Sequence, residues 1–282
     1  MITASLQAEI EKALGRKLLT VAPLSAANNA LIYRLGMDGG HLVVAKVSQQ
    51  GLDIEAFMLK YLKEKSKLPV PTIYYSNEHV IIMEFIESQY GADDKAQHHA
   101  AQLLADLHSI KAPMYGFERD TVIGSLRQPN PQSSDWVAFY AEHRLLYMAR
   151  ETYAEKKIDA KVMKQVEKIA GKLGQYFKNV NAPSLVHGDI WGGNILFSRG
   201  KVAAFLDPAI YFADHEAELA FIRLFNTFND AFFARYNEIS PIKPGFFEER
   251  ADIYNIYPLL VHTRLFGASY ARKVQKIVDK FS

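Results

Sequence analysis

The sequence predicts an α+β protein of two lobes, a small lobe built on an antiparallel sheet with one helix and a larger, mainly helical lobe. Two observations lead to this prediction. Residues 1–86 read as short apolar strands around one amphipathic segment, whereas residues 87–282 carry apolar residues at helical spacing, interrupted by one Gly-rich stretch. With 282 residues, 49% of them hydrophobic, the chain can bury both cores. Such a layout leaves a cleft between the lobes, where a ligand would bind.

Composition and charge exclude several classes of function. The chain has no Cys, which rules out disulfides, thiolate zinc sites, iron–sulfur clusters and a cysteine nucleophile. Its 33 Lys and Arg nearly balance 31 Asp and Glu, so no broad basic footprint for nucleic acid is expected. The longest apolar runs, such as 80–83 and 258–261, are far too short to span a membrane. Residues 1–19 form a helical pattern containing Glu9 and Glu11 rather than an apolar signal core, so we expect a soluble, cytoplasmic protein.

The small lobe is predicted from apolar strand segments and from the Gly- and Pro-rich turns that separate them. Residues 30–35 and 41–47 are strand candidates joined by a Gly-rich turn. Asp53 is expected to cap a helix that ends before the Pro-Val-Pro at 69–71, and 79–86 is nearly continuous in apolar residues, as in a buried strand. The apolar stripe of that helix comprises Ile54, Phe57, Met58, Tyr61 and Leu62.

The large lobe is predicted as helices around one loop and strand. Helices are expected at 96–110, 136–150 and 158–177. Residues 113–131 contain three Pro and two Gly, and we expect a long surface loop there of the kind that lines a site. Residues 184–207 are predicted as a Gly-rich loop followed by a short strand at 202–206.

The Gly-rich segment carries the strongest chemical signal. In LVHGDIWGGNILF (185–197), apolar flanks hold a polar turn that presents His187, Asp189 and Asn194, and Asp207 follows at the end of a short apolar strand. Phosphoryl transfer needs a carboxylate to receive the acceptor's proton and oxygen ligands for Mg²⁺. Asp189 with Asn194 five positions later matches the catalytic-loop spacing of the kinase fold, where Asp207 takes the place of the metal aspartate. The alternative is an Asx-rich turn whose carboxylate caps backbone amides.

Lys46 lies within the apolar strand LVVAKV (42–47). It shares a strand face with Leu42 and Val44, the face that a core would claim, and a buried ammonium needs a partner. Glu55, on the following helix, is the candidate partner, and in the kinase fold such a lysine holds the α- and β-phosphates of the nucleotide. The alternative is an edge-strand lysine that reaches solvent.

Glu84, Phe85 and Ile86 end the last strand of the small lobe. Backbone groups there can bond an adenine edge between apolar neighbours, while the alternative is a strand end that leads into a linker. Taken in chain order, the strand Lys, helix Glu, lobe junction, catalytic Asp, Asn and metal Asp occur at kinase-like intervals. We therefore expect residues 1–86 to be a nucleotide-binding lobe and 87–282 a catalytic and substrate lobe.

These residues resemble the fructosamine kinase (ketosamine-3-kinase) family, in the aminoglycoside phosphotransferase branch of the protein-kinase-like fold. The loop HGDIWGGN (187–194) is similar to the family's HGD-(L/I)-W-x-G-N more than to the HRD loop of protein kinases. FLDPA (205–209), Tyr211-Phe212 and HEAELA (215–220) resemble the family's DPA-x-Y and E-x-(D/E)-L-A stretch. Further similar segments are Tyr115-Gly116-Phe117 leading to Gly124, Asp135-Trp136 leading to His143-Arg144-Leu145, and Pro244-Gly245-Phe246.

The resemblance implies a reaction and a role for each site residue. Asp189 would be the general base, Asn194 and Asp207 the Mg²⁺ ligands, Lys46 the phosphate-binding group held by Glu55, and Glu84, Phe85 and Ile86 the adenine site. The implied reaction is phosphorylation by ATP of the 3-hydroxyl of a free or protein-bound ketosamine, after which the adduct breaks down and frees the amine, a deglycation repair.

The family's Gly-rich phosphate loop is replaced here by LSAANNA (24–30), which contains no Gly. Small side chains still let backbone amides approach a phosphate, and Asn tolerates a left-handed backbone, so Asn28 is assigned to nucleotide binding.

Three alternatives remain open at this point. The chain resembles other small-molecule kinases of the same fold, which act on an aminoglycoside, choline or another alcohol. A loop without Gly is also compatible with a nucleotide-binding protein that has lost catalysis. A protein kinase is disfavoured because the sequence leaves little room for an activation segment between Asp207 and the next helix. Oligomeric state does not follow from the sequence.

Overall fold

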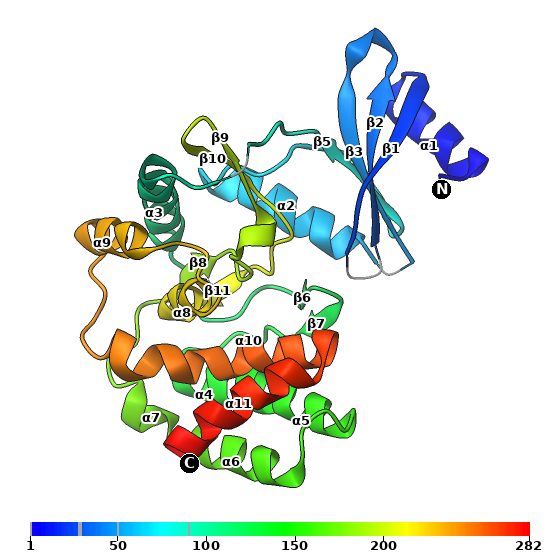
Figure 1. The fold of residues 1–282 in the computed structure, drawn as a ribbon. Coiled ribbons are helices and arrows are strands. Elements are labelled where there is room, and N and C mark those ends of the chain that lie inside the picture. Colours follow the sequence, from blue (N-terminus) through cyan, green and yellow to red (C-terminus); the bar gives the residue numbers. More distant parts are fainter. Residues whose placement is uncertain (1, 28–29, 50, 90) are drawn as a thin grey trace.

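The computed structural model describes residues 2–27, 30–49, 51–89 and 91–282, which fold into a sheet-based lobe and a larger helical lobe (Figure 1). The small lobe contains a five-stranded antiparallel sheet of order β1-β2-β3-β5-β4. Its elements are α1 (Ala4–Leu14), β1 (Leu18–Ala27), β2 (Ala30–Met37), β3 (Leu42–Ser48), α2 (Asp53–Lys65), β4 (Ile73–Ser76) and β5 (Val80–Glu84).

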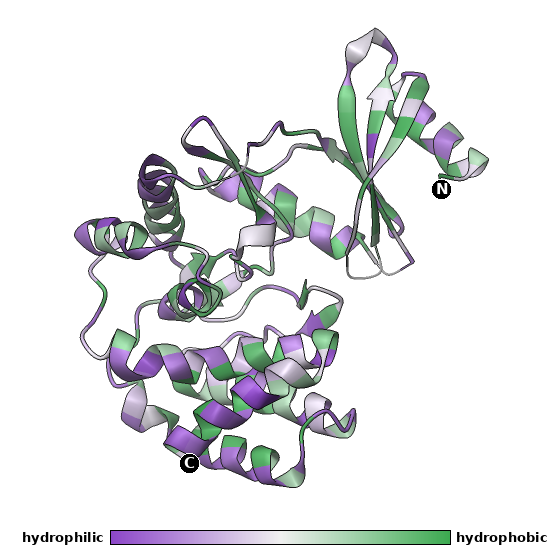
Figure 2. Ribbon diagram, viewed as in Figure 1, coloured by the Kyte–Doolittle hydropathy of each residue, from purple (hydrophilic) through white to green (hydrophobic). Residues whose placement is uncertain are grey.

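The two faces of the sheet are covered by different elements. Val80 and Ile82 of β5 pack with Ile10 of α1, whereas Ile81 and Met83 pack with Ala56 of α2. Because both faces of β5 are buried, its sequence is a continuous apolar run rather than an alternating one. The strands of the sheet carry mostly apolar residues (Figure 2).

The large lobe places its helices around three two-stranded sheets, β6–β7, β8–β11 and β9–β10. No helix of the described residues is long and apolar enough to cross a membrane. Its helices are α3 (Asp94–His108), α4 (Trp136–Tyr140), α5 (Tyr147–Ala154), α6 (Ala160–Ala170), α7 (Leu173–Tyr176), α8 (Glu216–Leu224), α9 (Asp230–Ile239), α10 (Ala251–Phe266) and α11 (Ala268–Phe281). Its strands are β6 (Thr121–Ile123), β7 (Leu126–Gln128), β8 (Ser184–Val186), β9 (Ile195–Ser198), β10 (Lys201–Phe205) and β11 (Tyr211–Ala213).

One expectation about the small lobe is wrong. Asp53 does not cap α2 but is its first residue; the N-cap is Leu52, which makes no side-chain capping bond. Leu52 is buried and its amide bonds to the carbonyl of Glu78, so tertiary packing sets the helix start. Both faces of β3 bury apolar residues: Val43 and Ala45 pack in the cluster that contains Ile10 of α1, whereas Val44, on the face of Lys46, packs against the cluster under α2, and Leu42 at the strand start is 43% exposed.

In the large lobe the expected helix at 136–150 is divided. A π-helical turn, Ala141–Leu146, separates α4 from α5, and the fully buried Arg144 lies within this wider turn. The helix expected at 158–177 ends at Ala170 and resumes as α7. The expected loop at 113–131 contains the β6–β7 hairpin, and its short strands are not predicted by a sequence rich in Pro and Gly.

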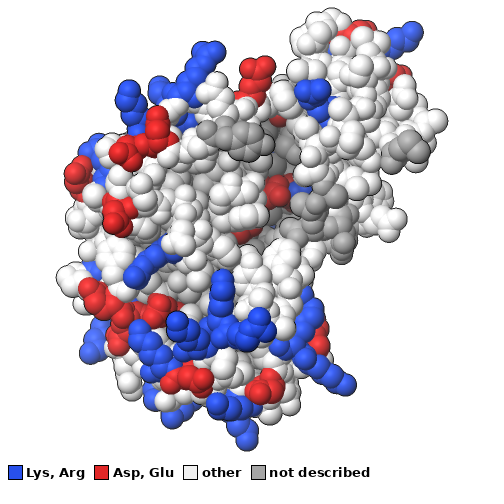
Figure 3. All heavy atoms as spheres, in the orientation of Figure 1, with Lys and Arg blue, Asp and Glu red and all other residues white. Residues whose placement is uncertain are grey.

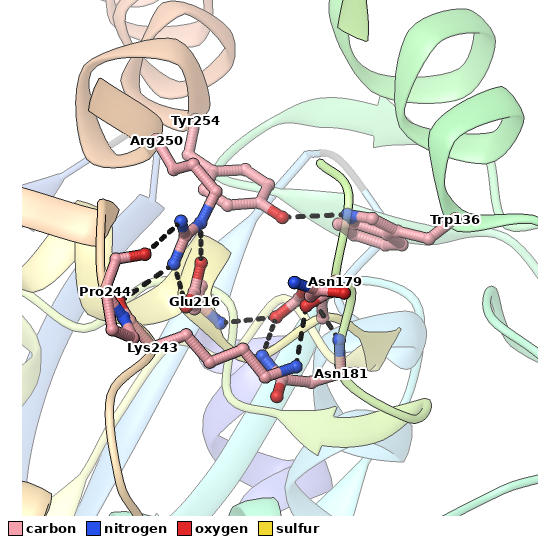
Figure 4. Close-up of polar contacts among 9 residues, drawn as sticks. Trp136, Asn179, Asn181, Glu216, Lys243, Pro244, Arg250 and Tyr254 are labelled. Carbon is pink, nitrogen blue, oxygen red and sulfur yellow. Dashed lines mark hydrogen bonds and ion pairs between the residues drawn. The ribbon is translucent and has the colours of Figure 1, made fainter. Parts of the chain in front are cut away.

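A polar network fastens α8 to the segment that leads into α10 (Figure 4). Arg250 donates to both carboxylate oxygens of Glu216 at 2.7 Å, and it also donates to the carbonyl of Pro244 at 2.8 Å. Beside it, the buried Asp214 accepts bonds from the backbone and side chain of Asn181 and from the amide of Glu216. The network holds the start of α8 in place, behind the cleft described below.

Replacing Glu216 by Ala is expected to lower the free energy of unfolding by about 3–5 kcal/mol, because it removes a buried carboxylate and leaves the largely covered Arg250 guanidinium without its partner. Urea denaturation followed by circular dichroism measures this. Glu238→Ala, which breaks the exposed Arg235–Glu238 pair, is the matched control and should cost about 0–1 kcal/mol. Equal losses in the two variants would contradict a structural role for the buried pair.

Candidate active site

A cleft of about 1220 Å³ lies between the two lobes, and its walls come from both of them. Figure 3 shows the hollow, with acidic and basic side chains at its floor. Asn28 lies outside the described residues. The other predicted site residues all line this cleft: Lys46, Glu55, Glu84, Phe85, Ile86, Asp189, Asn194 and Asp207.

Lys46 joins the two lobes at the centre of the cleft. Its Nζ lies 2.8 and 2.7 Å from the carboxylate oxygens of Glu55 on α2, and 3.0 Å from Oδ1 of Asp207 in the large lobe. Burial alone would lower the pKa of Lys46, but the two carboxylates outweigh it and raise that pKa above its usual range. The lysine is therefore a fixed positive charge, and it does not reach away to solvent.

Asp189 and Asn194 form the second half of the site. The side-chain amide of Asn194 donates to Oδ2 and to the backbone carbonyl of Asp189, both at 2.9 Å. Burial, and then the negative charge of Asp207, raise the pKa of Asp189 to about 8. This carboxyl therefore binds a proton more tightly than an ordinary aspartate does, as a group that takes a proton during a reaction requires.

Asp207 is held in an unusual backbone conformation. Its φ is 50°, in the left-handed region that residues other than Gly rarely adopt. The chain on its N-terminal side is fixed by two bonds, from the amide of Phe205 to the carbonyl of Pro69 and from the amide of Leu206 to that of Asn194. Such strain persists only where the surroundings impose it, and here it aims the carboxylate at Lys46.

The backbone around Asp189 is fixed by contacts with Ala209, in the segment that follows Asp207. The amide of Ala209 bonds to the carbonyl of His187 at 2.7 Å, and Gly188 has a φ of +86°. A Cβ on Gly188 would approach the carbonyl oxygen of Ala209 to less than 3.0 Å, so only Gly fits there. The turn that presents Asp189 is thus packed directly against the segment that follows Asp207.

Glu218 is a buried carboxylate behind this turn that sequence reasoning did not select. Its Oε1 accepts the amide of Gly188 at 2.6 Å, and its Oε2 lies 2.8 Å from Nε2 of His108. These contacts hold the pKa of Glu218 below its usual value, although burial opposes them. Glu218 belongs to the stretch 215–220 that resembles the family motif, but the motif alone does not say which of its two carboxylates contacts the catalytic turn.

The outer end of the cleft is apolar. β5 ends at Glu84, whose carboxylate turns away to accept the amide of Thr72 at 3.1 Å, and Phe85 and Ile86 follow in the connection to the large lobe. Apolar side chains from both lobes face this end of the cleft, namely Val44, Met83, Leu196 and Leu206. A flat heteroaromatic ring fits between two such surfaces.

Two further parts of the cleft wall were not predicted as site residues. The turn of the β6–β7 hairpin contributes Gly124 and Ser125, with Val122 beside them. Trp191, next to the catalytic turn, is 41% exposed, and its ring lies over Gly193 so closely that a Cβ there would collide with it. The position of Trp191 next to Asp189 is visible in the sequence, and residues 113–131 were expected to line a site, but only the fold shows which of them reach the cleft.

The donor set of Asn194 and Asp207 fits Mg²⁺. The Asn194 amide nitrogen faces Asp189, which leaves its oxygen as the ligand atom, and the Asp207 carboxylate is 35% exposed toward the cleft. Within the described ranges no cluster of three or more His, Cys, Asp or Glu could hold a metal ion. Two oxygen donors suit a cation that keeps several waters and takes its remaining ligands from phosphates.

Comparison with known proteins agrees with this geometry. The fructosamine kinase family model matches residues 31–282. The chain is 34% identical over 238 residues to a chloroplastic protein-ribulosamine 3-kinase of Arabidopsis thaliana, covering 80% of this chain and 71% of that protein. A crystal structure of a candidate fructosamine-3-kinase from Thermobifida fusca superposes with a TM-score of 0.89 at 27% identity, covering 98% of both chains. An aminoglycoside phosphotransferase crystallised with ADP and hygromycin B shares the fold, with a TM-score of 0.68 at 15% identity over 99% of both chains.

Proposed function

The chain belongs to the fructosamine kinase family, and on that premise we propose that it transfers the γ-phosphoryl group of Mg·ATP to the 3-hydroxyl of a ketosamine. The main observation in support of this function is that one cleft between the lobes is lined by Lys46, Glu55, Asp189, Asn194 and Asp207. The names of the relatives support a fructosamine or ribulosamine as the acceptor, free or attached to protein.

Each of these residues has a role in the proposal. When bound, Mg·ATP supplies the phosphoryl group and the charge that stabilises its transfer. Lys46, fixed by Glu55, binds the phosphates, while Asn194 and Asp207 hold the metal. Asp189 takes the proton of the acceptor hydroxyl as the new O–P bond forms and the bond to the leaving ADP breaks. The phosphorylated ketosamine then breaks down and frees the amine.

The proposal assigns nucleotide binding to residues 1–86 and acceptor binding and catalysis to residues 87–282. Adenine would lie against Glu84, Phe85 and Ile86 at the lobe junction, between the apolar walls of the cleft. The assignment of Asn28 to nucleotide binding stays a proposal from the sequence. In this division the phosphates would lie near Lys46, which also contacts the large lobe through Asp207.

The nearest alternative is a kinase of the same fold that acts on an aminoglycoside or choline, which the shared architecture supports. Such cationic acceptors are favoured by acidic groups around the catalytic carboxylate. In this cleft Glu55 and Asp207 are both paired with Lys46. The described cleft lining carries five carboxylates, of Glu55, Glu84, Glu87, Asp189 and Asp207, against three cations, of Arg34, Lys46 and Arg199, so charge alone does not separate these acceptors from a ketosamine.

The decisive experiment measures ADP release with Mg·ATP over fructoselysine, ribuloselysine, an aminoglycoside and choline, with Asp189→Ala as the blank. We expect turnover on the ketosamines alone. Turnover confined to the aminoglycoside or choline would replace the acceptor assignment. No turnover on any compound, with Mg·ATP binding intact by calorimetry, would mean that the chain binds nucleotide without this catalysis.

A further inference from the structure

Arg144 is a fully buried cation that the proposed reaction does not use. It lies in the π-helical turn between α4 and α5. Its Nη1 donates to the carbonyl of Pro129 at 2.6 Å and to that of His143 at 2.9 Å, and its Nη2 donates to Oδ1 of Asn130 at 2.5 Å. Among the described residues, none provides a hydrogen-bond partner for its Nε.

The surroundings of this guanidinium are aromatic rather than acidic. Its centre lies 4.0 Å from the ring of Tyr211, 4.9 Å from that of Phe139 and 5.7 Å from that of Tyr257. No carboxylate in the described part of the chain forms an ion pair with it. A buried charge without a counter-ion is costly, so its stabilisation comes from ring faces and from the backbone and amide oxygens it binds. Two of those oxygens, of Pro129 and Asn130, belong to the segment that follows β7.

From Asn130 a chain of buried hydrogen bonds runs through the β6–β7 hairpin. The side-chain amide of Asn130 donates to the hydroxyl of Thr121 at 2.8 Å, and Gln128 donates to the same hydroxyl at 2.9 Å. Gln128 also donates to the carbonyl of Ala209 at 3.0 Å and accepts the hydroxyl of Tyr257 at 3.0 Å. The base of the hairpin is thus tied to Ala209, which bonds the catalytic turn at His187.

The tip of this hairpin forms one wall of the cleft. Gly124 and Ser125, in the two-residue turn, and Val122 of β6 face the same space as Asp189 and Asp207. The β6–β7 hairpin lies beside α10 of the large lobe, apart from β5, whose end leads into the lobe junction (Figure 1). The cleft volume of about 1220 Å³ exceeds the usual range for one drug-sized ligand, so an acceptor fits beside a nucleotide.

We infer that Arg144 is a positioning residue for the acceptor: through Asn130 it fixes the β6–β7 hairpin as the acceptor-side wall of the cleft. The inference rests on the proposed function for the identity of the acceptor, a polyhydroxylated ketosamine. Arg144 itself touches no reacting atom. Its planar guanidinium both stacks on the rings and binds three separate oxygens, which an ammonium group cannot reproduce.

The test compares Arg144→Lys with Arg264→Lys. Arg264 is the matched control, because its side chain is 11% exposed and is paired with Glu155 in the same helical lobe, yet it makes no bond to the hairpin. Hydrogen exchange of the amides at 121–128 is measured in both variants, together with KM for fructoselysine and KM for ATP. Asn130→Ala, which removes the amide that links Arg144 to Thr121, is the second variant if Arg144→Lys does not fold.

We expect exchange at 121–128 at least about tenfold faster in Arg144→Lys than in Arg264→Lys. KM for fructoselysine should rise at least about tenfold while KM for ATP stays within about twofold, because only the acceptor wall is displaced. Equal hairpin exchange in the two variants overturns the inference, and so does faster exchange with an unchanged KM for fructoselysine. If the wild-type protein turns over no ketosamine, the proposed acceptor is wrong, and the exchange comparison still decides whether Arg144 fixes the hairpin.

Discussion

Replacing Asp189 by Ala is expected to leave a folded protein that binds Mg·ATP but has lost about 10²–10⁴-fold in kcat. The carboxylate is half-buried at the cleft floor and is held by the amide of Asn194, so it can accept a proton from a hydroxyl placed against it. ADP release under saturating ketosamine and Mg·ATP measures the loss. Calorimetry with Mg·ATP shows that the nucleotide site is intact.

Asp189→Asn is the conservative companion, since it keeps the shape of the side chain and removes its basicity. It should lose as much turnover as the Ala variant. Asp207→Ala provides the contrast, because it removes a proposed metal ligand and one partner of Lys46, and should weaken Mg·ATP binding itself. Turnover near the wild-type level in either Asp189 variant would overturn its assignment as the base.

Replacing Gly188 by Ala is expected to lower the free energy of unfolding by about 2–5 kcal/mol, from about 1–2 for the left-handed backbone and about 1–3 for the collision. The collision is with the carbonyl oxygen of Ala209, a backbone atom that cannot rotate away. Because the displaced turn carries Asp189, the protein that does fold should have little activity. Denaturation in urea and ADP release measure the two effects.

Gly192 is the matched control for Gly188, because it lies in the same loop and a Cβ there would meet nothing within 4 Å. Gly192→Ala should change the free energy of unfolding by less than about 1 kcal/mol. If the Gly188 variant were as stable and as active as the Gly192 variant, the backbone approach between the catalytic turn and Ala209 would not constrain the site.

The polar part of the site was predictable because its signal is local in sequence. Asp189 and Asn194 lie on one turn, Asp207 ends the strand that follows it, and Lys46 precedes Glu55 by nine residues, a spacing that reaches from a strand to the next helix. Burial then required Lys46 to have a partner. The structure adds a second partner, Asp207, which no spacing argument could supply.

The features that the sequence did not predict depend on contacts between distant segments. Alternation along β3 shows two faces without saying that one packs with α1 while the other, which carries Lys46, meets α2 and the cleft. The start of α2 depends on the hydrogen bond from the amide of Leu52 to the carbonyl of Glu78. The helix at 136–150 is interrupted by a π-helical turn that contains Arg144, which bonds to Asn130. The role of the hairpin in the cleft likewise follows from its docking on Ala209.

The segment between Asp207 and α8 is locked into the fold along its whole length. Ala209, Ile210 and Ala213 are fully buried, β11 pairs with β8, and Phe212 exchanges two backbone hydrogen bonds with Gly116. Kinases that are turned on by modification depend on a free stretch at this place, which becomes ordered when a charge is added. In this chain the segment between Asp207 and α8 is already ordered without an added charge. A covalent modification on this stretch is therefore not needed to order it.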